Sequence, residues 1–170
     1  VLLGFAAFRI SLSGRVYNSH KIGGYKMTKT KAIMCDLDGT LSINDHGRSF
    51  FEADDCDKDS LNKPVSLVLR MARSSGIKII YLSGREDKYR KPTEKFLNNH
   101  DLDYDFYMDD KDYPLFMRKT GDNRSDDIIK WEIYEEHIKP NYDIQFILDD
   151  RNQVVDMWRD KCNLTCFQVA

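Results

Sequence analysis

From residue 31 onward, short apolar runs of the kind that form buried strands alternate with segments whose apolar residues recur at helical spacing. Residues 77–82 and 144–148 are mostly apolar, as expected for strands that are buried on both faces of a sheet. Strands that alternate with helices of about 10–15 residues form mainly parallel sheets. The alternation therefore predicts an α/β fold with three layers, whose strands lie at residues 31–35, 77–82, 105–108, 144–148 and 164–169.

Proline and cap residues mark where the helices of this pattern begin. Pro64 and Pro92 each stand at a position where proline opens a helix, because its missing N–H is not needed there. Ser125 is the expected N-cap of a third helix, and the two acids that follow it suit the positive end of a helix dipole. The pattern predicts helices over residues 64–76, 92–100 and 125–140, and a last one around residues 154–158.

Aspartate is over-represented among the acidic residues. Of the 28 acidic residues, 22 are Asp and 6 are Glu, although Glu is the better helix former. Asp favours caps, turns, metal sites and nucleophilic carboxylates, so the excess indicates loops and chemistry. The net charge of −2 provides no overall positive field, so nucleic acid could be held only by local cations. The four Cys lack the spacing of a zinc site, which favours reduced thiols in a cytoplasmic protein.

The first residues differ in composition from the rest of the chain. Residues 1–26 carry four basic residues and no acid, whereas acids outnumber bases in the remainder. The apolar stretch at residues 1–8 is far shorter than the ~20 residues that a membrane span needs, so no membrane association is expected. Met27 directly precedes the first strand. We therefore expect residues 1–26 to be a leader or an appended extension, with a transit peptide as the weaker alternative, and residues 27–170 to form the folded domain.

Polar side chains follow three of the predicted strands, at the edge where open α/β sheets bind their ligands. Residues 36–40 (Asp-Leu-Asp-Gly-Thr) follow the first strand, residues 83–85 (Ser-Gly-Arg) the second, and residues 149–151 (Asp-Asp-Arg) the fourth. Lys130 lies near the start of the helix that precedes this fourth strand. Carboxylates, a hydroxyl and cations at one edge are the groups that phosphoryl transfer requires.

Each of these residues also has a purely structural explanation. Asp-Asp pairs occur four times in the chain, and most such pairs are turn or cap residues, but only residues 149–150 follow a buried strand. Ser83 alone would be an ordinary turn residue, and Lys130 alone a solvated helix lysine. For Asp36 and Asp38 the structural explanation is weak, because two acids directly after a buried strand are costly unless they are paired or liganded.

Taken in this order, the four motifs resemble those of the haloacid dehalogenase (HAD) superfamily, and the resemblance implies a HAD-like Rossmannoid fold. By the same resemblance Asp36 is the nucleophile that forms an aspartyl-phosphate, and Asp38 protonates the leaving oxygen. Ser83 and Lys130 would bind the phosphate. Because Asp38 must be protonated to act as an acid, we expect its pKa to be raised. The cofactor implied is Mg2+, held by Asp36, the backbone carbonyl of Asp38, Asp149 and Asp150.

The spacing of the motifs leaves no room for a large cap domain. Between Asp38 and Ser83 lie 44 residues, and between Ser83 and Lys130 lie 46, and each interval already holds predicted helix and strand. The remainder of the first interval, residues 43–61, is expected to be a long irregular loop. An uncapped site stays open, which suits a phosphate carried on a large substrate.

A closer resemblance covers residues 33–170, which are similar to the 3'-phosphatase domains of polynucleotide kinases. It implies that Arg85 and Arg118 join Lys130 as cations of the phosphate site, and that Asp126 orients or neutralises one of them. A guanidinium gives two parallel hydrogen bonds to a phosphate, which a lysine cannot. No GxxxxGK[ST] loop occurs in the chain, so 5'-kinase activity is not expected. The resemblance rests on residues 47–49, 56–57, 83–86, 121–122, 124, 126–127, 130, 149–151, 153–155, 157–159 and 168–170.

The sequence thus favours a Mg2+-dependent phosphatase that removes 3'-phosphate from DNA or RNA ends. The substrate would be held by its terminal phosphate and by a local basic surface formed by Lys88, Arg90, Lys91 and Arg118. Two alternatives stay open: a phosphatase of small nucleotides or sugar phosphates, and a non-catalytic module that binds nucleic-acid ends. The resemblance also makes a homo-oligomer possible, because a phage member of the polynucleotide kinase family is a tetramer.

Overall fold

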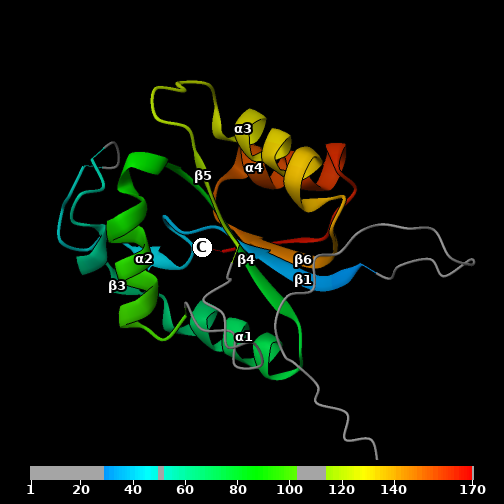
Figure 1. Ribbon diagram of the computed structural model, residues 1–170, viewed down its shortest axis with the longest axis horizontal. Coiled ribbons are helices and arrows are strands. Elements are labelled where there is room, and N and C mark those ends of the chain that lie inside the picture. The colour runs from blue at the N-terminus through cyan, green and yellow to red at the C-terminus, as the bar shows by residue number, and fades with distance from the viewer. Residues whose placement is uncertain (1–28, 50–51, 103–113, 170) are drawn as a thin grey trace, which may run out of the picture.

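A five-stranded parallel sheet organises the protein, as a computed structural model describes it for residues 29–49, 52–102 and 114–169 (Figure 1). Every pairing within this sheet is parallel. β1 lies at the centre of the sheet, between β4 and β6. The strand order is β5-β4-β1-β6-β7, with β1 at Thr30–Cys35, β4 at Lys78–Glu86, β5 at Leu115–Arg118, β6 at Tyr142–Asp149 and β7 at Cys166–Gln168.

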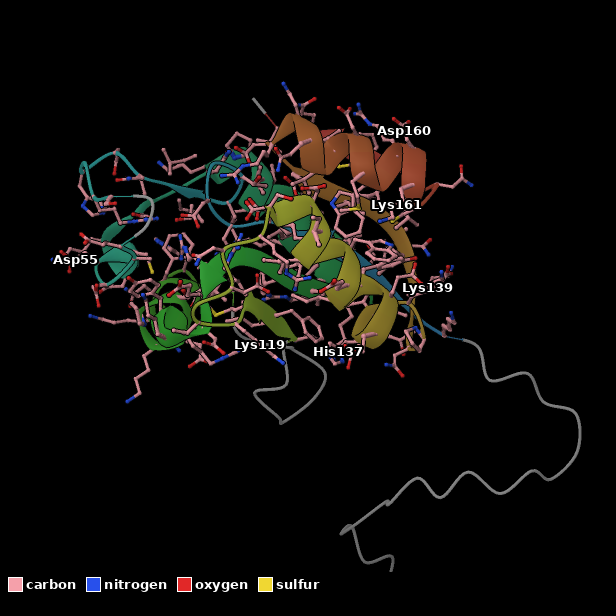
Figure 2. All side chains as sticks on the ribbon, turned by 90° about the horizontal axis from the view of Figure 1, so that it is seen from above. Asp55, Lys119, His137, Lys139, Asp160 and Lys161 are labelled. Atoms are coloured by element: carbon pink, nitrogen blue, oxygen red, sulfur yellow. The ribbon has the colours of Figure 1, made fainter. Side chains whose placement is uncertain are left out.

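Helices cover both faces of the sheet, so the fold has three layers (Figure 1). On one face lie α1 (Lys63–Ser74) and α2 (Arg90–Asn99), and on the other α3 (Asp126–Ile133) and α4 (Asn152–Asp156). Seen from above, α3 and α4 lie side by side and contact each other (Figure 2). α3 continues into a π-helical turn at Tyr134–Ile138, and α4 into another at Met157–Lys161.

β1 shows why two cores form. Its residues alternate, so that Ile33 and Cys35 belong to the core beneath α1 and α2, while Ala32 and Met34 pack with Trp158 on the opposite side. All of these β1 side chains are at most 1% exposed. A central strand that is buried on both faces is the expected signature of a parallel sheet with helices on either side, so the predicted α/β fold is confirmed.

The structure differs from the predicted elements at two strands, β4 and β5. β4 continues beyond Leu82 to Glu86, so residues 83–85 lie within the strand, where the pairing with β5 shifts register. β5 was not predicted, because its four residues are too few to show a periodicity and its burial alternates as in an edge strand. The strand expected at residues 105–108 falls outside the described residues.

The interval 43–61 is more ordered than the irregular loop that we expected. β2 (Ser42–Ile43) and β3 (Ser60–Leu61) form a short antiparallel pair, and a 3-10 turn at Cys56–Lys58 packs against α2. This flap is too small to be a cap domain, in agreement with the predicted absence of a large one. Among the helices that the structure describes, none is both long and apolar enough to cross a membrane.

Candidate active site

The turn after β1 places Asp36 at the carboxyl edge of the sheet. The backbone N–H of Asp36 donates to Leu148 O at 2.9 Å, so this residue continues the pairing of β1 with β6. The chain then turns tightly, and the N–H groups of Thr40, Leu41 and Ser42 all donate to Leu37 O. Only 6% of Asp36 is exposed, so its carboxylate is removed from bulk water.

Gly39 allows a second carboxylate to approach this turn. Its φ of +83° lies in the left-handed region, which side chains with a Cβ rarely adopt. A Cβ at this position would also overlap the carboxylate of Asp150, which comes from the end of β6. The absence of a side chain at residue 39 therefore brings Asp150 against the turn that carries Asp36.

Three carboxylates meet at this edge. Asp36, Asp149 and Asp150 each offer an oxygen, and these oxygens lie within 4.8 Å of one another. Burial raises the pKa of Asp36 to about 7, with a further increase from Asp149, although Lys130 opposes both. The pKa of Asp150 is also raised, by burial and by the charge of Asp149. Oxygen donors in such a cluster are what Mg2+ or Ca2+ prefers, so the residues fit the expected Mg2+.

Lys130, which comes from α3, joins the turn that carries Asp36 to the acidic pair at residues 149–150. Its Nζ donates to Asp36 Oδ1 at 2.7 Å and to Asp149 Oδ2 at 2.8 Å. Burial alone would lower the pKa of Lys130, but the two carboxylates outweigh this and raise it, so the ammonium stays charged. Only 2% of Lys130 is exposed, which excludes the solvated helix lysine that was the structural alternative.

Asp38 lies in a clamp of two arginines. Arg85 donates from Nε to Oδ2 at 2.7 Å and from Nη2 to Oδ1 at 2.8 Å, and Arg48 donates from Nη2 to Oδ1 at 2.6 Å. Burial by itself would raise the pKa of Asp38, but the hydrogen bonds and charges of the two arginines lower it. The expected rise in the pKa of Asp38 is therefore wrong, because two arginines that are distant in sequence surround its carboxylate.

Asp59 forms ion pairs with the same two arginines, Arg48 and Arg85. Its carboxylate accepts from Arg48 Nε at 2.9 Å and Nη2 at 2.6 Å, and from Arg85 Nη2 at 3.2 Å. The side chain of Asp59 is fully buried, and it also bonds the Ser42 hydroxyl and His46. Arg85 Nη1 donates to Thr93 Oγ1 at 3.3 Å. All three nitrogens of the Arg85 guanidinium are therefore engaged within the protein.

The role of Asp59 was missed in the sequence, and so was the contact of Arg48 with Asp38. Arg48 lies in a stretch shared with the polynucleotide kinase phosphatases, so a signal for it existed. Asp59 is one of 22 Asp residues, and no local pattern separates it from those in turns. Its importance comes from the β2–β3 flap, which folds it back onto Arg48.

Ser83 lies in β4 beside this cluster and is fully buried. Its Oγ accepts from the backbone N–H of Arg85 at 3.1 Å, so its own hydroxyl hydrogen stays available. A Cβ on the neighbouring Gly84 would come within 2.8 Å of Asp126 Oδ1, so residue 84 lets the N-terminal turn of α3 approach the strand.

Asp126 pairs with two arginines, as the expectation of a supporting role requires. Arg118 Nη2 donates to Oδ1 and Arg151 Nη1 to Oδ2. Arg118 also donates from Nε to Gly84 O, and from Nη1 to the carbonyls of residues 122 and 124. Because every nitrogen of its guanidinium is engaged by the protein, this geometry favours Arg118 as a clamp on α3 over the expected phosphate ligand.

The basic surface predicted beside the site is largely neutralised in the structure. Lys88 pairs with Glu86, and Arg90 pairs with Glu94 and donates to Leu115 O. By contrast, the structure brings most of the predicted site residues together at the carboxyl edge. They are Asp36, Asp38, Ser83, Arg85, Lys130, Asp149 and Asp150. The structure thus brings carboxylates, a hydroxyl and cations to one edge of the sheet.

The parallel sheet, the Asp-rich turn after β1 and the Lys130-bridged carboxylates define a phosphatase of the haloacid dehalogenase class. A solved class C acid phosphatase from Bacillus anthracis with tungstate bound shares this fold, with a TM-score of 0.54 and 17% identity over 84% of this chain and 67% of that one. The chain belongs to the family described as the polynucleotide kinase PNKP phosphatase domain, whose model matches residues 30–170.

Two relatives have higher identity. A chain in the solved structure of the Pnkp1/Rnl/Hen1 RNA repair complex is 49% identical, with a TM-score of 0.76 over 88% of this chain and 45% of that one. A putative bifunctional polynucleotide kinase/RNA ligase from Autographa californica nuclear polyhedrosis virus is 30% identical over 142 residues, which are 82% of this chain and 19% of the viral protein. The chain therefore spans less than half the length of either relative.

Proposed function

We propose that this chain is a Mg2+-dependent 3'-phosphatase that acts on the ends of polynucleotides. The observation that carries the proposal is the buried contact of Lys130 with both Asp36 and Asp149. This contact joins a candidate nucleophile to a candidate metal ligand. The match to the polynucleotide kinase phosphatase family supports the substrate class.

In the first step, a carboxylate oxygen of Asp36 attacks the phosphorus of the terminal phosphate. The bond between phosphorus and the 3'-oxygen breaks, and this oxygen takes a proton from Asp38 to become the 3'-hydroxyl. Lys130 offsets the repulsion between the attacking carboxylate and the anionic phosphate. Two of its three ammonium hydrogens are used by Asp36 and Asp149, which leaves one for a phosphate oxygen. The Ser83 hydroxyl is the second donor.

In the second step, water attacks the phosphorus of the aspartyl-phosphate on Asp36. Asp38 accepts the proton of this water, phosphate leaves, and the Asp36 carboxylate is restored. The lowered pKa of Asp38 suits this step, because a base must be ionised before it accepts a proton. For the first step Asp38 must carry a proton, and the bound anionic phosphate favours this, because a nearby negative charge raises the pKa of a carboxyl group.

Asp36, Asp149 and Asp150 are the residues that would hold Mg2+, together with the backbone carbonyl of Asp38. When bound, the ion neutralises phosphate charge and so lowers the barrier to attack by a carboxylate. The chain itself contributes the placement of these oxygens. The three carboxylates repel one another. Lys130 offsets this repulsion by binding Asp36 and Asp149, and Gly39 leaves room for Asp150.

Within residues 29–49, 52–102 and 114–169, the small β2–β3 flap leaves the carboxyl edge without a cap domain, and a nucleic-acid end requires such access. The small-metabolite alternative is less favoured for this reason. The non-catalytic alternative is less favoured because the acids and the lysine of the motifs converge at one site. We propose Arg85 and Arg48 as residues that position Asp38, and Arg118 as a clamp on Asp126.

A direct assay tests the proposed function. Phosphate release with Mg2+ is measured from a 3'-phosphorylated oligonucleotide, a 5'-phosphorylated oligonucleotide and a sugar phosphate. We expect release from the first substrate only, and its loss in Asp36→Asn. Asp54→Asn, which changes an exposed Asp that takes no part in these contacts, serves as the matched control and should retain activity. Hydrolysis of the sugar phosphate with an intact oligonucleotide would overturn the proposal.

A further inference from the structure

Arg151 is a cation at the site that the chemistry above does not use. It directly follows Asp149 and Asp150, at the N-cap of α4. Its backbone N–H donates to Asp149 Oδ1 at 3.2 Å, which ties the residue to the carboxylate cluster. The side chain is 55% exposed, whereas Arg48 and Arg85 expose 5% or less. The backbone of Arg151 therefore lies at the carboxylate cluster, and its side chain extends to solvent.

One end of the Arg151 guanidinium is fixed in place. Nη1 donates to Asp126 Oδ2, and Asp126 is itself held by Arg118 on its other oxygen. Asp126 lies against Gly84, the residue next to Ser83 in β4. This chain of contacts orients Arg151 toward the side of the site where the terminal phosphate would lie.

The remaining donors of Arg151 are free to bind a ligand. Among the interactions of the described residues, neither Nε nor Nη2 of this guanidinium has an acceptor. A half-exposed guanidinium that is fixed at one nitrogen loses little conformational freedom when the others bind an anion. Its planar fork of N–H groups matches two oxygens of a phosphate.

Some of the other cations around the site are already committed to carboxylates. Arg124, also half exposed, is paired with both Asp122 and Glu132. Lys88 is paired with Glu86. Figure 2 shows Lys139 and Lys161 toward one end of the molecule and Asp55, in the flap beside the site, at the opposite end. These lysines lie away from the carboxyl edge, so Arg151 is the better placed to meet a polyanion.

We propose that Arg151 binds the phosphodiester next to the 3'-terminal nucleotide, and that this contact makes the enzyme prefer polynucleotides to 3'-mononucleotides. The inference rests on the proposed function, because it assigns the terminal phosphate to Lys130 and Ser83. A 3'-mononucleotide has no internal phosphodiester, and a dinucleotide with a 3'-phosphate has one. The two substrates therefore differ in the group that Arg151 recognises.

The experiment compares kcat/KM for a 3'-phosphorylated dinucleotide and for the 3'-mononucleotide, in the wild type and in Arg151→Ala. We expect the wild type to prefer the dinucleotide about tenfold or more, as one charge-assisted contact allows. In Arg151→Ala the preference should approach unity, mainly through KM. The ratio between the two substrates cancels any general loss of chemistry that follows when Asp126 loses one of its two arginine partners.

Two further measurements sharpen the test. The dependence of log KM on log salt concentration for the dinucleotide should become shallower by about 0.7 in the variant, the share of one phosphate contact on a single strand. Arg124→Ala removes a similarly exposed arginine and should keep the wild-type preference. An Arg151→Ala enzyme that still prefers the dinucleotide as the wild type does would overturn the proposal.

The assay distinguishes a failure of the proposed role of Arg151 from a failure of the proposed function. A wild type that hydrolyses both substrates equally well refutes the role of Arg151 and leaves the phosphatase intact. A wild type that hydrolyses neither substrate, but hydrolyses a sugar phosphate, refutes the proposed function and the inference with it.

Discussion

Lys130 and Asp36 are separated by 94 residues in the chain, and the Nζ of one donates to the Oδ1 of the other at 2.7 Å. The same ammonium donates to Asp149, so a single buried cation holds two buried carboxylates from β1 and β6 in place. Without this cation, the acids would repel one another in a region that little water reaches. The contact is therefore a condition for stability as well as for the proposed chemistry.

Replacing Lys130 with Met tests this double role. We expect phosphatase activity to fall at least 100-fold, as in the loss of a transition-state cation. In the absence of Mg2+ the variant should be destabilised by about 3 kcal/mol, because two buried acids lose their partner. Urea unfolding measures the second effect. Lys139→Met, which removes only an exposed pair with Glu135, should change both quantities little.

The raised pKa of Asp36 predicts a pH dependence of the metal-free protein. The native state holds a proton on Asp36 up to pH about 7, whereas the unfolded chain releases it near pH 3.8. The contribution of Asp36 to the free energy of unfolding therefore decreases as the pH rises from 4 to 7, by up to about 1.4 kcal/mol per pH unit. Asp36→Asn should lack this decrease, so urea unfolding in EDTA should show its stability relative to the wild type rising across that range. A constant difference between the two proteins would contradict the prediction.

Removing Asp59 should release the arginine clamp around Asp38. Asp59→Ala leaves Arg48 and Arg85 buried without one of their carboxylates, which should cost about 3 kcal/mol of stability. Activity should fall at least tenfold, because Asp38 loses its fixed orientation. Chemical denaturation and phosphate release report the two effects. Asp57→Ala, which breaks a pair with the exposed Lys95, is the control and should be nearly neutral.

Replacing Arg118 with Ala tests whether this residue holds α3 against β4 or binds the phosphate of the substrate. If Arg118 holds α3 to β4, the variant should lose about 2 kcal/mol of stability, because carbonyl and carboxylate acceptors lose their donor. Its inhibition constant for inorganic phosphate should change less than threefold. A tenfold weaker inhibition at wild-type stability would instead show that Arg118 binds the phosphate.

Gly39→Ala should weaken the metal site specifically. The added Cβ would overlap the Asp150 carboxylate at a φ that disfavours alanine, so Asp150 must move away from Asp36 and Asp149. We expect the stabilisation of the protein by Mg2+, measured as a shift in Tm, to be reduced at least by half. Gly76→Ala also has positive φ but an open surrounding, and should retain the full Mg2+ response.

Much of the fold and of the site follows from local pattern. The order of strands and helices predicted the parallel sheet, because apolar periodicity reports which faces of an element are buried. Acids directly after such strands must lie at the carboxyl edge, so Asp36 and Asp149 could be placed from the sequence. Ser83 lies within β4 and not after it, so its position was not given by this rule. β5 could not, since four residues at a sheet edge carry too little periodicity.

The partners of the charged groups were decided only by the tertiary structure. The family resemblance implied that Lys130 and Arg85 would bind a phosphate. The fold sets Lys130 between two acids and places Arg85 against Asp38. It also brings Asp59, in the flap, onto the same arginine. Burial and charge pairing act through space between distant segments, so the direction of the pKa shift of Asp38 depends on neighbours that sequence adjacency does not specify. The sequence by itself determined which elements form and which edge carries the chemistry, and the tertiary contacts determined which charges meet there.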